Sequence, residues 1–174
     1  LPQHLTYDER DVERLGTRLK MNPPIRYQKD KQTLWNRLHD GTIACIATDH
    51  APHPREDKDC EWAAAAMGMV GLETALWVAV EVFIESGLLS WRDLADRMST
   101  IPARIGQVPD QGMPIAPGSP ANLTVWDPSA QGTLEVDALV GKSGNSPYLG
   151  RWMPGAVRHV LFRGHPTVVD GVLA

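Results

Sequence analysis

The sequence has few cysteines, no long apolar run and no excess of positive charge. Cys45 and Cys60 are the two cysteines among the 174 residues, and they do not form a Cys-x-x-Cys pair. Cys45 lies within an apolar run, so we expect a buried thiol in a reducing, cytoplasmic setting. No run of about 18 apolar residues occurs, and no transmembrane helix is therefore expected. The net charge of −4 offers no electrostatic basis for binding nucleic acid or an anionic membrane.

Helical patterns alternate with loops over the first two-thirds of the chain. Thr6 and Glu9 resemble a capping box, which predicts a helix over residues 7–15. The two prolines of KMNPPIR, residues 20–26, predict a loop. Further helices are predicted over residues 27–41, 71–85 and 90–100. The apolar face expected for the helix over 71–85 consists of Leu72, Leu76, Ala79, Val80 and Phe83.

A short strand and a later change of texture suggest two parts. The apolar segment TIACIAT, residues 42–48, is typical of a buried strand. After Val108 the sequence becomes rich in glycine and proline and contains short alternating segments, which are typical of antiparallel strands. We therefore predict an α/β fold, with βα units of a parallel sheet or barrel in residues 1–108 and strands of a small β-sandwich in residues 109–174.

A carboxylate and two imidazoles follow the predicted strand, in the string DHAPH. Functional groups of a βα barrel lie at the C-terminal ends of its strands and in the loops that follow, which is where Asp49 is expected. A carboxylate there can bind a divalent metal and accept a proton from metal-bound water. His50 and His53 could bind metal or contact an anionic substrate group. An aspartate after a strand is also a common turn former, so these residues alone leave both interpretations open.

The longer string DGTIACIATDHAPH, followed by GMVGLETAL, resembles the dihydroorotases, a family of cyclic amidohydrolases. Further segments resemble that family in the same order along the chain: LPQHLTYDE, KMNPPIR, IPARIG, APGSPANLTVWDP and NSPYLGRWMPGAVRHVLFRG. The resemblance covers nearly the whole sequence. It implies the C-terminal part of a TIM-like (β/α)8 barrel followed by strands of a small β-sandwich, and a chain that is a C-terminal fragment of a longer protein.

The resemblance also implies roles for individual residues. Asp49 matches the aspartate that binds the more buried metal and acts as general base and proton shuttle. His53 matches the histidine that contacts the substrate carboxylate, and Asn22 matches the asparagine that hydrogen-bonds the pyrimidine ring. Gly68 matches a glycine whose backbone N–H helps to hold the substrate, although the two residues before it differ from the usual proline and aromatic.

Two other histidines lie close to these matched positions. His50 could orient the Asp49 carboxylate, or it could simply pack within its loop. His4 stands in a PQHL string where the family often has paired histidines, and we expect a structural role for it rather than metal binding.

The metal site implied by the family needs ligands that this sequence lacks. The family uses a His-x-His pair, a bridging carboxylate and two further histidines, and no His-x-His occurs here. Two Zn²⁺ ions are therefore implied, with every ligand except Asp49 in the missing N-terminal half of the barrel. One carboxylate cannot hold a catalytic zinc, and a partial barrel exposes apolar edges. We expect the isolated chain to be inactive, to bind metal weakly and to be poorly soluble.

The implied reaction is the reversible conversion of dihydroorotate and N-carbamoyl-L-aspartate in pyrimidine biosynthesis. Its expected partners are a small-molecule substrate and the missing half of the barrel, not nucleic acid or a membrane. One alternative is a hydantoinase or allantoinase, and the APH string argues against it because those relatives usually lack it. Another is a non-catalytic partner of aspartate transcarbamoylase, against which the presence of Asp49 argues.

Overall fold

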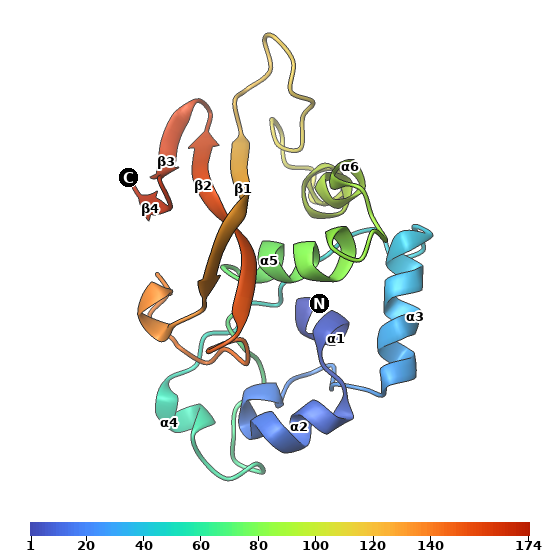
Figure 1. Cartoon of the computed structure of the whole chain (residues 1–174), viewed down its shortest axis with the longest axis vertical. Helices are drawn as coiled ribbons and strands as arrows, with labels where there is room; N and C mark the ends of the chain where they lie inside the picture. Colours follow the sequence, from blue (N-terminus) through green and yellow to red (C-terminus); the bar gives the residue numbers. More distant parts are fainter.

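The computed structural model describes all residues from 1 to 174. Helices fill the first part of the chain and a four-stranded sheet the last part (Figure 1). The helical elements are α1 (Pro2–Thr6), α2 (Glu9–Leu15), η1 (Gly16–Leu19), α3 (Gln28–His39), α4 (Arg55–Lys58), α5 (Ala75–Ala79), η2 (Val80–Ile84), α6 (Trp91–Ala95), η3 (Asp96–Thr100), α7 (Ile101–Ile105) and η4 (Val136–Ala138). None of them combines the length and apolar content that a membrane crossing requires.

The first predicted helix begins two residues later than expected. Its capping residue is Asp8, whose side chain accepts a hydrogen bond from the Arg10 amide at 3.1 Å. The Asp11 carboxylate in turn accepts from the Asp8 amide at 3.0 Å, which completes a capping box. Thr6 instead ends α1, where its hydroxyl donates to the Pro2 carbonyl oxygen. The predicted Thr6–Glu9 box is therefore wrong, because Asp8 and Asp11, two residues further along the chain, form the capping box instead.

Two long helical stretches contribute to the core. Elements α5 and η2 run continuously from Ala75 to Ile84, and α6, η3 and α7 run from Trp91 to Ile105. Figure 1 shows α5 between the sheet and α3. Val78 and Phe83 have no exposed surface, whereas Leu72, which we expected on the buried face, is 62% exposed because it precedes the helix.

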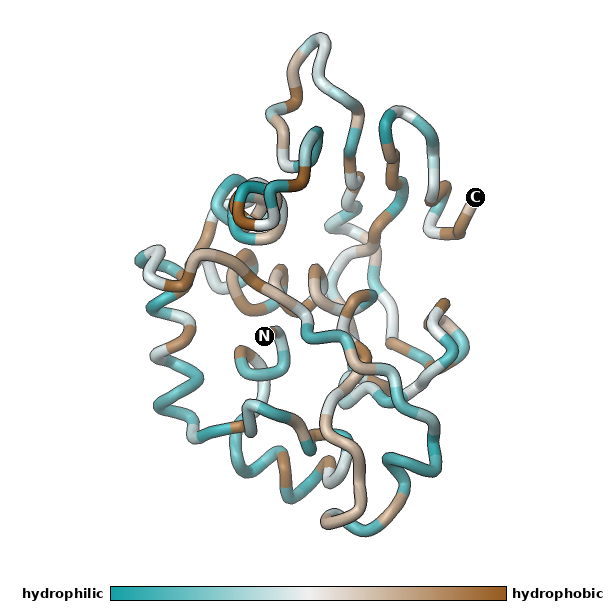
Figure 2. The backbone as a smooth tube through the Cα atoms, turned by 180° about the vertical axis from the view of Figure 1, so that it is seen from behind, coloured by the Kyte–Doolittle hydropathy of each residue, from teal (hydrophilic) through white to brown (hydrophobic).

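The segment 42–48 is extended but belongs to no strand, so the predicted strand is wrong as a hydrogen-bonded element. Two of its amides donate to backbone carbonyls, that of Ile43 to Arg37 and that of Ile46 to Arg97. The only bridge nearby is an isolated parallel one between His50 and Met69. Figure 2 shows this apolar stretch crossing the face opposite that of Figure 1. A ladder is absent because no neighbouring strand lies beside the segment in these 174 residues.

The antiparallel strands expected after Val108 are present. They are β1 (Leu123–Thr133), β2 (Trp152–Phe162), β3 (His165–Val169) and β4 (Val172–Leu173), paired in the order β1-β2-β3-β4. Both β1–β2 and β2–β3 contain register shifts, which bend the sheet locally. The Trp77 indole N–H donates to the Gly155 carbonyl at 3.1 Å, so α5 packs directly on β2.

The segment that precedes β2 returns to the helical part. Tyr148 is completely buried, and its ring stacks on that of Tyr7 with 5.3 Å between centroids. The Tyr7 hydroxyl donates to the Pro147 carbonyl at 2.9 Å. Arg151 pairs with Glu81 of η2 at 2.6 Å. These contacts fix residues 145–151 against α1 and η2, and so bring a late segment of the chain next to the early loops.

Candidate active site

Three loops that are separate in sequence meet at one place. We call them the NPP segment (residues 20–26), the DHAPH segment (residues 49–53) and the glycine loop (residues 66–68). The Gly68 amide donates to the Lys20 carbonyl at 3.0 Å, which joins the glycine loop to the NPP segment. The Ala51 amide donates to the Met69 carbonyl at 2.8 Å, which joins the DHAPH segment to the residue after that loop. The predicted site residues are therefore carried by mutually bonded loops.

Asp49 stands free at the start of the DHAPH segment. It is exposed, has a φ of 51°, and its carboxylate makes no hydrogen bond or ion pair within the chain. Aspartate tolerates this left-handed conformation better than most residues do. A carboxylate that caps no helix and pairs with no cation is available for chemistry. Asp49 therefore caps no helix, while its left-handed φ is one that turn formers adopt.

His4 bonds to the NPP segment. The His4 Nε2 atom donates to the Pro23 carbonyl at 2.8 Å, next to Asn22, whose own side chain is exposed. Burial lowers the pKa of His4. His4 therefore joins α1 to the loop that bears Asn22.

The histidines of the DHAPH segment both bond to backbone. His50 Nδ1 accepts from the amides of Gly71 and Leu72, at 3.1 and 3.3 Å. This is the loop-packing role rather than the orientation of Asp49. His53 Nε2 lies 2.9 Å from the Met67 carbonyl oxygen, so that nitrogen carries a proton and donates it. His53 consequently contacts the glycine loop directly.

Gly68 is a glycine for reasons of space and conformation. Its φ is 121°, and a Cβ at this position would lie 2.5 Å from the Ala51 Cβ and 3.4 Å from His53 Nε2. Its amide is used by the Lys20 carbonyl, so in this conformation the expected free N–H is not available to a ligand. The correction has a simple cause: the NPP segment lies close enough to take that hydrogen bond.

The sequence analysis missed two buried polar residues at this place, Lys58 and Asn145. Lys58 is 3% exposed, and its ammonium donates to the carbonyls of Ala66, Gly68 and Lys20 at 2.8, 3.0 and 3.3 Å. Burial lowers the pKa of Lys58. Nothing in the charged loop PREDKD distinguishes this lysine from exposed neighbours. Asn145 is 7% exposed and belongs to the NSPYLGR segment, whose family resemblance was the one available signal.

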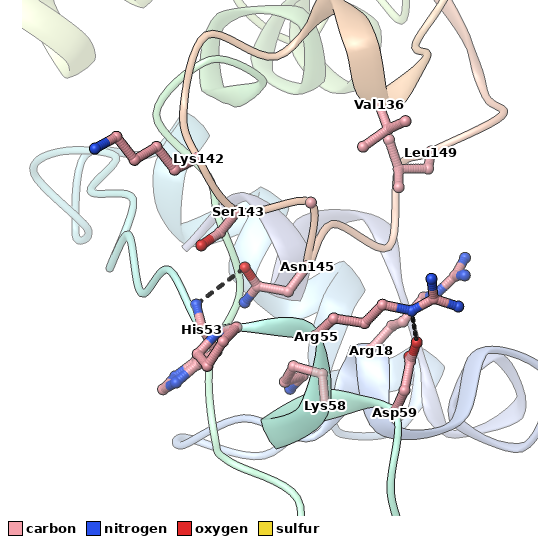
Figure 3. A pocket seen from close by; sticks show the side chains of 12 residues that line it. Arg18, His53, Arg55, Lys58, Asp59, Val136, Lys142, Ser143, Asn145 and Leu149 are labelled. Atoms are coloured by element: carbon pink, nitrogen blue, oxygen red, sulfur yellow. Dashed lines mark hydrogen bonds and ion pairs between the residues drawn. The ribbon is translucent and has the colours of Figure 1, made fainter.

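A pocket of about 360 Å³ opens beside His53 (Figure 3). Most of its polar lining is cationic or neutral, and Asp59 is its one carboxylate. The cations are Arg18, Arg55, Lys58 and Lys142. Arg55 pairs with Asp59 at 2.7 Å, while the side chains of Arg18 and Lys142 have no partner in the chain. The pocket therefore carries positive charge in a protein of negative net charge.

The chain does not contain a metal site of its own. No group of three or more histidine, cysteine, aspartate or glutamate side chains is placed to hold an ion. Asp49 alone provides one ligand, and a catalytic zinc usually needs three from protein. The residues of this chain therefore do not fit a resident metal without additional ligands.

The comparisons with known proteins agree with the resemblance seen in the sequence. No protein-family model matches the chain. A dihydroorotase of Streptomyces coelicolor is 51% identical over 172 residues, which are 99% of this chain and 40% of that protein. A dihydroorotase of Mycobacterium tuberculosis is 45% identical over 170 residues, which are 98% of this chain and 40% of that protein.

Solved structures show the same relationship in three dimensions. An L-hydantoinase (dihydropyrimidinase) from Arthrobacter aurescens matches with a TM-score of 0.90 and 31% identity, over 99% of this chain and 39% of that one. A D-hydantoinase (dihydropyrimidinase) from Thermus sp. matches with a TM-score of 0.88 and 28% identity, over the same shares. The chain spans about two-fifths of the length of the curated relatives that it matches. Over that length the chain is a relative of the dihydroorotases in sequence and of the cyclic amidohydrolases in fold.

Proposed function

We propose that this chain forms part of a dihydroorotase, an enzyme that interconverts dihydroorotate and N-carbamoyl-L-aspartate in pyrimidine biosynthesis. The observation that carries the proposal is the unpaired, exposed Asp49 carboxylate, which belongs to one of three mutually bonded loops. The 51% identity to a dihydroorotase supports the choice of substrate. Residues 1–108 would form part of a TIM-like barrel, and residues 109–174 would provide strands of a small β-sandwich.

Asp49 is the proposed general base. Its carboxylate would take a proton from the attacking water as the water oxygen bonds to the ring carbonyl carbon. The protonated Asp49 would then deliver that proton to the ring nitrogen as the carbon–nitrogen bond breaks. The broken bond leaves a carbamoyl group and a carboxyl group, the carboxyl group releases its remaining proton to solvent, and Asp49 regains its charge. An exposed carboxylate with no internal partner suits both transfers.

His53, Asn22 and Gly68 are the proposed substrate-binding residues. His53 would contact the substrate carboxylate, and the cations of the adjoining pocket would add attraction for an anion. The exposed Asn22 amide would hydrogen-bond the ring. Gly68 would contribute mainly by letting its loop approach His53, because its amide already donates to Lys20. Such orientation can provide several kcal/mol of the lowering of the barrier, roughly 7–11 kcal/mol at most.

A metal site would need ligands beyond those of this chain. We propose that Asp49 provides one ligand to a Zn²⁺ site whose other ligands lie elsewhere in a longer protein. Zinc would supply Lewis acidity and an activated water. The rest of the barrel is thus the first proposed partner, and association with aspartate transcarbamoylase is a second.

The complete protein containing this chain provides the test. Asp49→Asn should lower kcat for dihydroorotate by about 10²–10⁴-fold, as expected for loss of a general base. His53→Ala should raise KM for dihydroorotate. Neither substitution removes a buried hydrophobic contact, so circular dichroism should confirm that both variants fold.

The alternatives give different results in the same assay. A hydantoinase, favoured by the fold match at 28–31% identity, would leave KM for its ring substrate unaffected by His53→Ala. A non-catalytic scaffold would show no hydrolysis by the unmodified protein. Full activity in Asp49→Asn would contradict the proposed mechanism outright.

A further inference from the structure

Every carbonyl of the glycine loop accepts a hydrogen bond from a side chain. The pairs are Ala66 with Lys58 at 2.8 Å, Met67 with His53 at 2.9 Å, and Gly68 with both Lys58 at 3.0 Å and Asn145 at 3.4 Å. Backbone carbonyls of an exposed loop normally bond to water or to other backbone groups. Three consecutive side-chain bonds indicate a loop whose position is fixed by polar contacts.

Asn145 is the residue that joins this loop to the DHAPH segment. Its Oδ1 atom accepts from the His53 amide at 3.2 Å. Its Nδ2 group donates to the Ala51 carbonyl at 2.9 Å and to the Gly68 carbonyl at 3.4 Å. One planar amide therefore spans both loops, and Figure 3 shows it facing the backbone nitrogen of His53. These partners lie 77 to 94 residues away in sequence.

The backbone that carries Asn145 is itself held firmly. Ser146 and Tyr148 have no exposed surface, and Tyr148 stacks on Tyr7 of the helical part. The Asn145 carbonyl accepts from the Val70 amide at 3.2 Å, just beyond the glycine loop. Asn145 is thus an immobile bridge between a late segment and two early loops.

We propose that Asn145 is a positioning residue that sets the spacing between His53 and the glycine loop, and through it the geometry offered to a substrate carboxylate. The inference rests on the proposed function, because it assigns Asn145 to the same site. Removing the amide would leave the His53 N–H and the Ala51 carbonyl without partners in a nearly buried place. The two loops would then separate, and His53 would lose its fixed orientation.

Steady-state kinetics of the complete protein provide the test. Asn145→Ala should raise KM for dihydroorotate by roughly tenfold or more, while kcat changes far less. A purely structural residue would lower the amount of folded enzyme without moving KM. Asn145→Asp has nearly the same shape and lacks both donors, so it should raise KM too and replaces the alanine variant if that variant does not fold.

Asn122→Ala is the matched control. Asn122 also uses both ends of its amide to join two segments, donating to the Asp110 carbonyl at 2.5 Å and accepting from the Arg163 amide at 2.7 Å. Those contacts lie within residues 109–174 and do not involve the DHAPH segment or the glycine loop. Asn122→Ala should therefore leave KM unchanged.

Amide hydrogen exchange gives a readout that does not need activity. The His53 amide should exchange faster in folded Asn145→Ala than in the unmodified protein, because its acceptor, the Asn145 Oδ1 atom, is lost. Unchanged exchange at His53, or an unchanged KM in a folded variant of an active enzyme, would overturn the positioning role. Absence of dihydroorotate hydrolysis by the unmodified protein would refute the proposed function instead, and the exchange measurement would still decide whether Asn145 positions the loops.

Discussion

Replacing Gly68 by alanine tests whether the site depends on a close approach of two loops. The φ of 121° is one that residues with a side chain rarely adopt, and the new Cβ would lie 2.5 Å from the Ala51 Cβ. A residue held in such a conformation costs about 1–3 kcal/mol. Forcing an extra methyl group into a packed place costs about 1–3 kcal/mol more. We therefore expect Gly68→Ala to lower the free energy of unfolding by about 2–6 kcal/mol.

Gly118 separates the two contributions. Its φ is 88°, and no heavy atom lies within 4 Å of the position that a Cβ would take. Gly118→Ala should therefore show only the conformational cost, about 1–3 kcal/mol. Urea unfolding of the complete protein, followed by tryptophan fluorescence, measures both variants. KM for dihydroorotate should rise only in Gly68→Ala, since only that loop contacts His53. Equal destabilisation by the two substitutions would refute the close approach.

Two further variants, one of them a double substitution, test charged groups. Asp8→Asn should lower the free energy of unfolding by about 1–3 kcal/mol, because the buried Asp8 caps α2 and bonds to Arg10 and Lys31. The hydrogen bond from Arg10, above all, lowers the pKa of Asp8 below its usual value of 3.8. The stabilisation that Asp8 provides is therefore present above pH 3.8 and is lost as the pH falls below it. Acid unfolding at the same pH in Asp8→Asn and the unmodified protein would contradict this. Arg18→Gln combined with Lys142→Gln should weaken the salt dependence of kcat/KM for an anionic substrate without changing the melting temperature, since neither side chain has a partner. An unaltered salt dependence would show that the pocket does not attract the substrate.

Local sequence signals located the longer helical stretches but not the short helices α1 and α4. The helix predicted over residues 90–100 begins where α6 does, because its cap, Ser90, and its buried residue, Leu94, are local features of the sequence. The same logic failed at Thr6, where a neighbouring Asp8–Asp11 pair provides a competing cap. Thr6 is the last residue of α1, so the cap of α2 falls to Asp8.

Site residues that lie in a recognisable sequence motif were predictable, whereas residues that reach the site only through the fold were not. The strings around Asn22 and His53 pointed to loops that the structure does bring together. The buried roles of Lys58 and Asn145 depend on contacts between residues far apart in the chain, and neither residue type nor spacing reveals them. Whether Asp49 and its neighbours act on dihydroorotate stays a prediction for the assays above.

The extended segment 42–48 has backbone groups that lack hydrogen-bond partners within this chain. Of the amides from Ala44 to Asp49, only that of Ile46 has an acceptor, and no carbonyl of this stretch accepts a hydrogen bond. Unpaired extended backbone of this kind is a template for adjoining strands. If such strands flank it in the complete protein, hydrogen exchange measured by mass spectrometry should be fast over 44–48 in the isolated chain and slow in the complete protein.

The loop over residues 111–119 is the internal control for that experiment, because it is rich in glycine and proline and belongs to no helix or strand. Its exchange should be fast in both proteins. Equal, fast exchange of 44–48 in both would mean that no strand joins the segment, and Asp49 would then lie at the end of a free loop instead of a barrel strand. Because a general base must be held within hydrogen-bonding reach of its proton, that result would remove the structural basis for its proposed role.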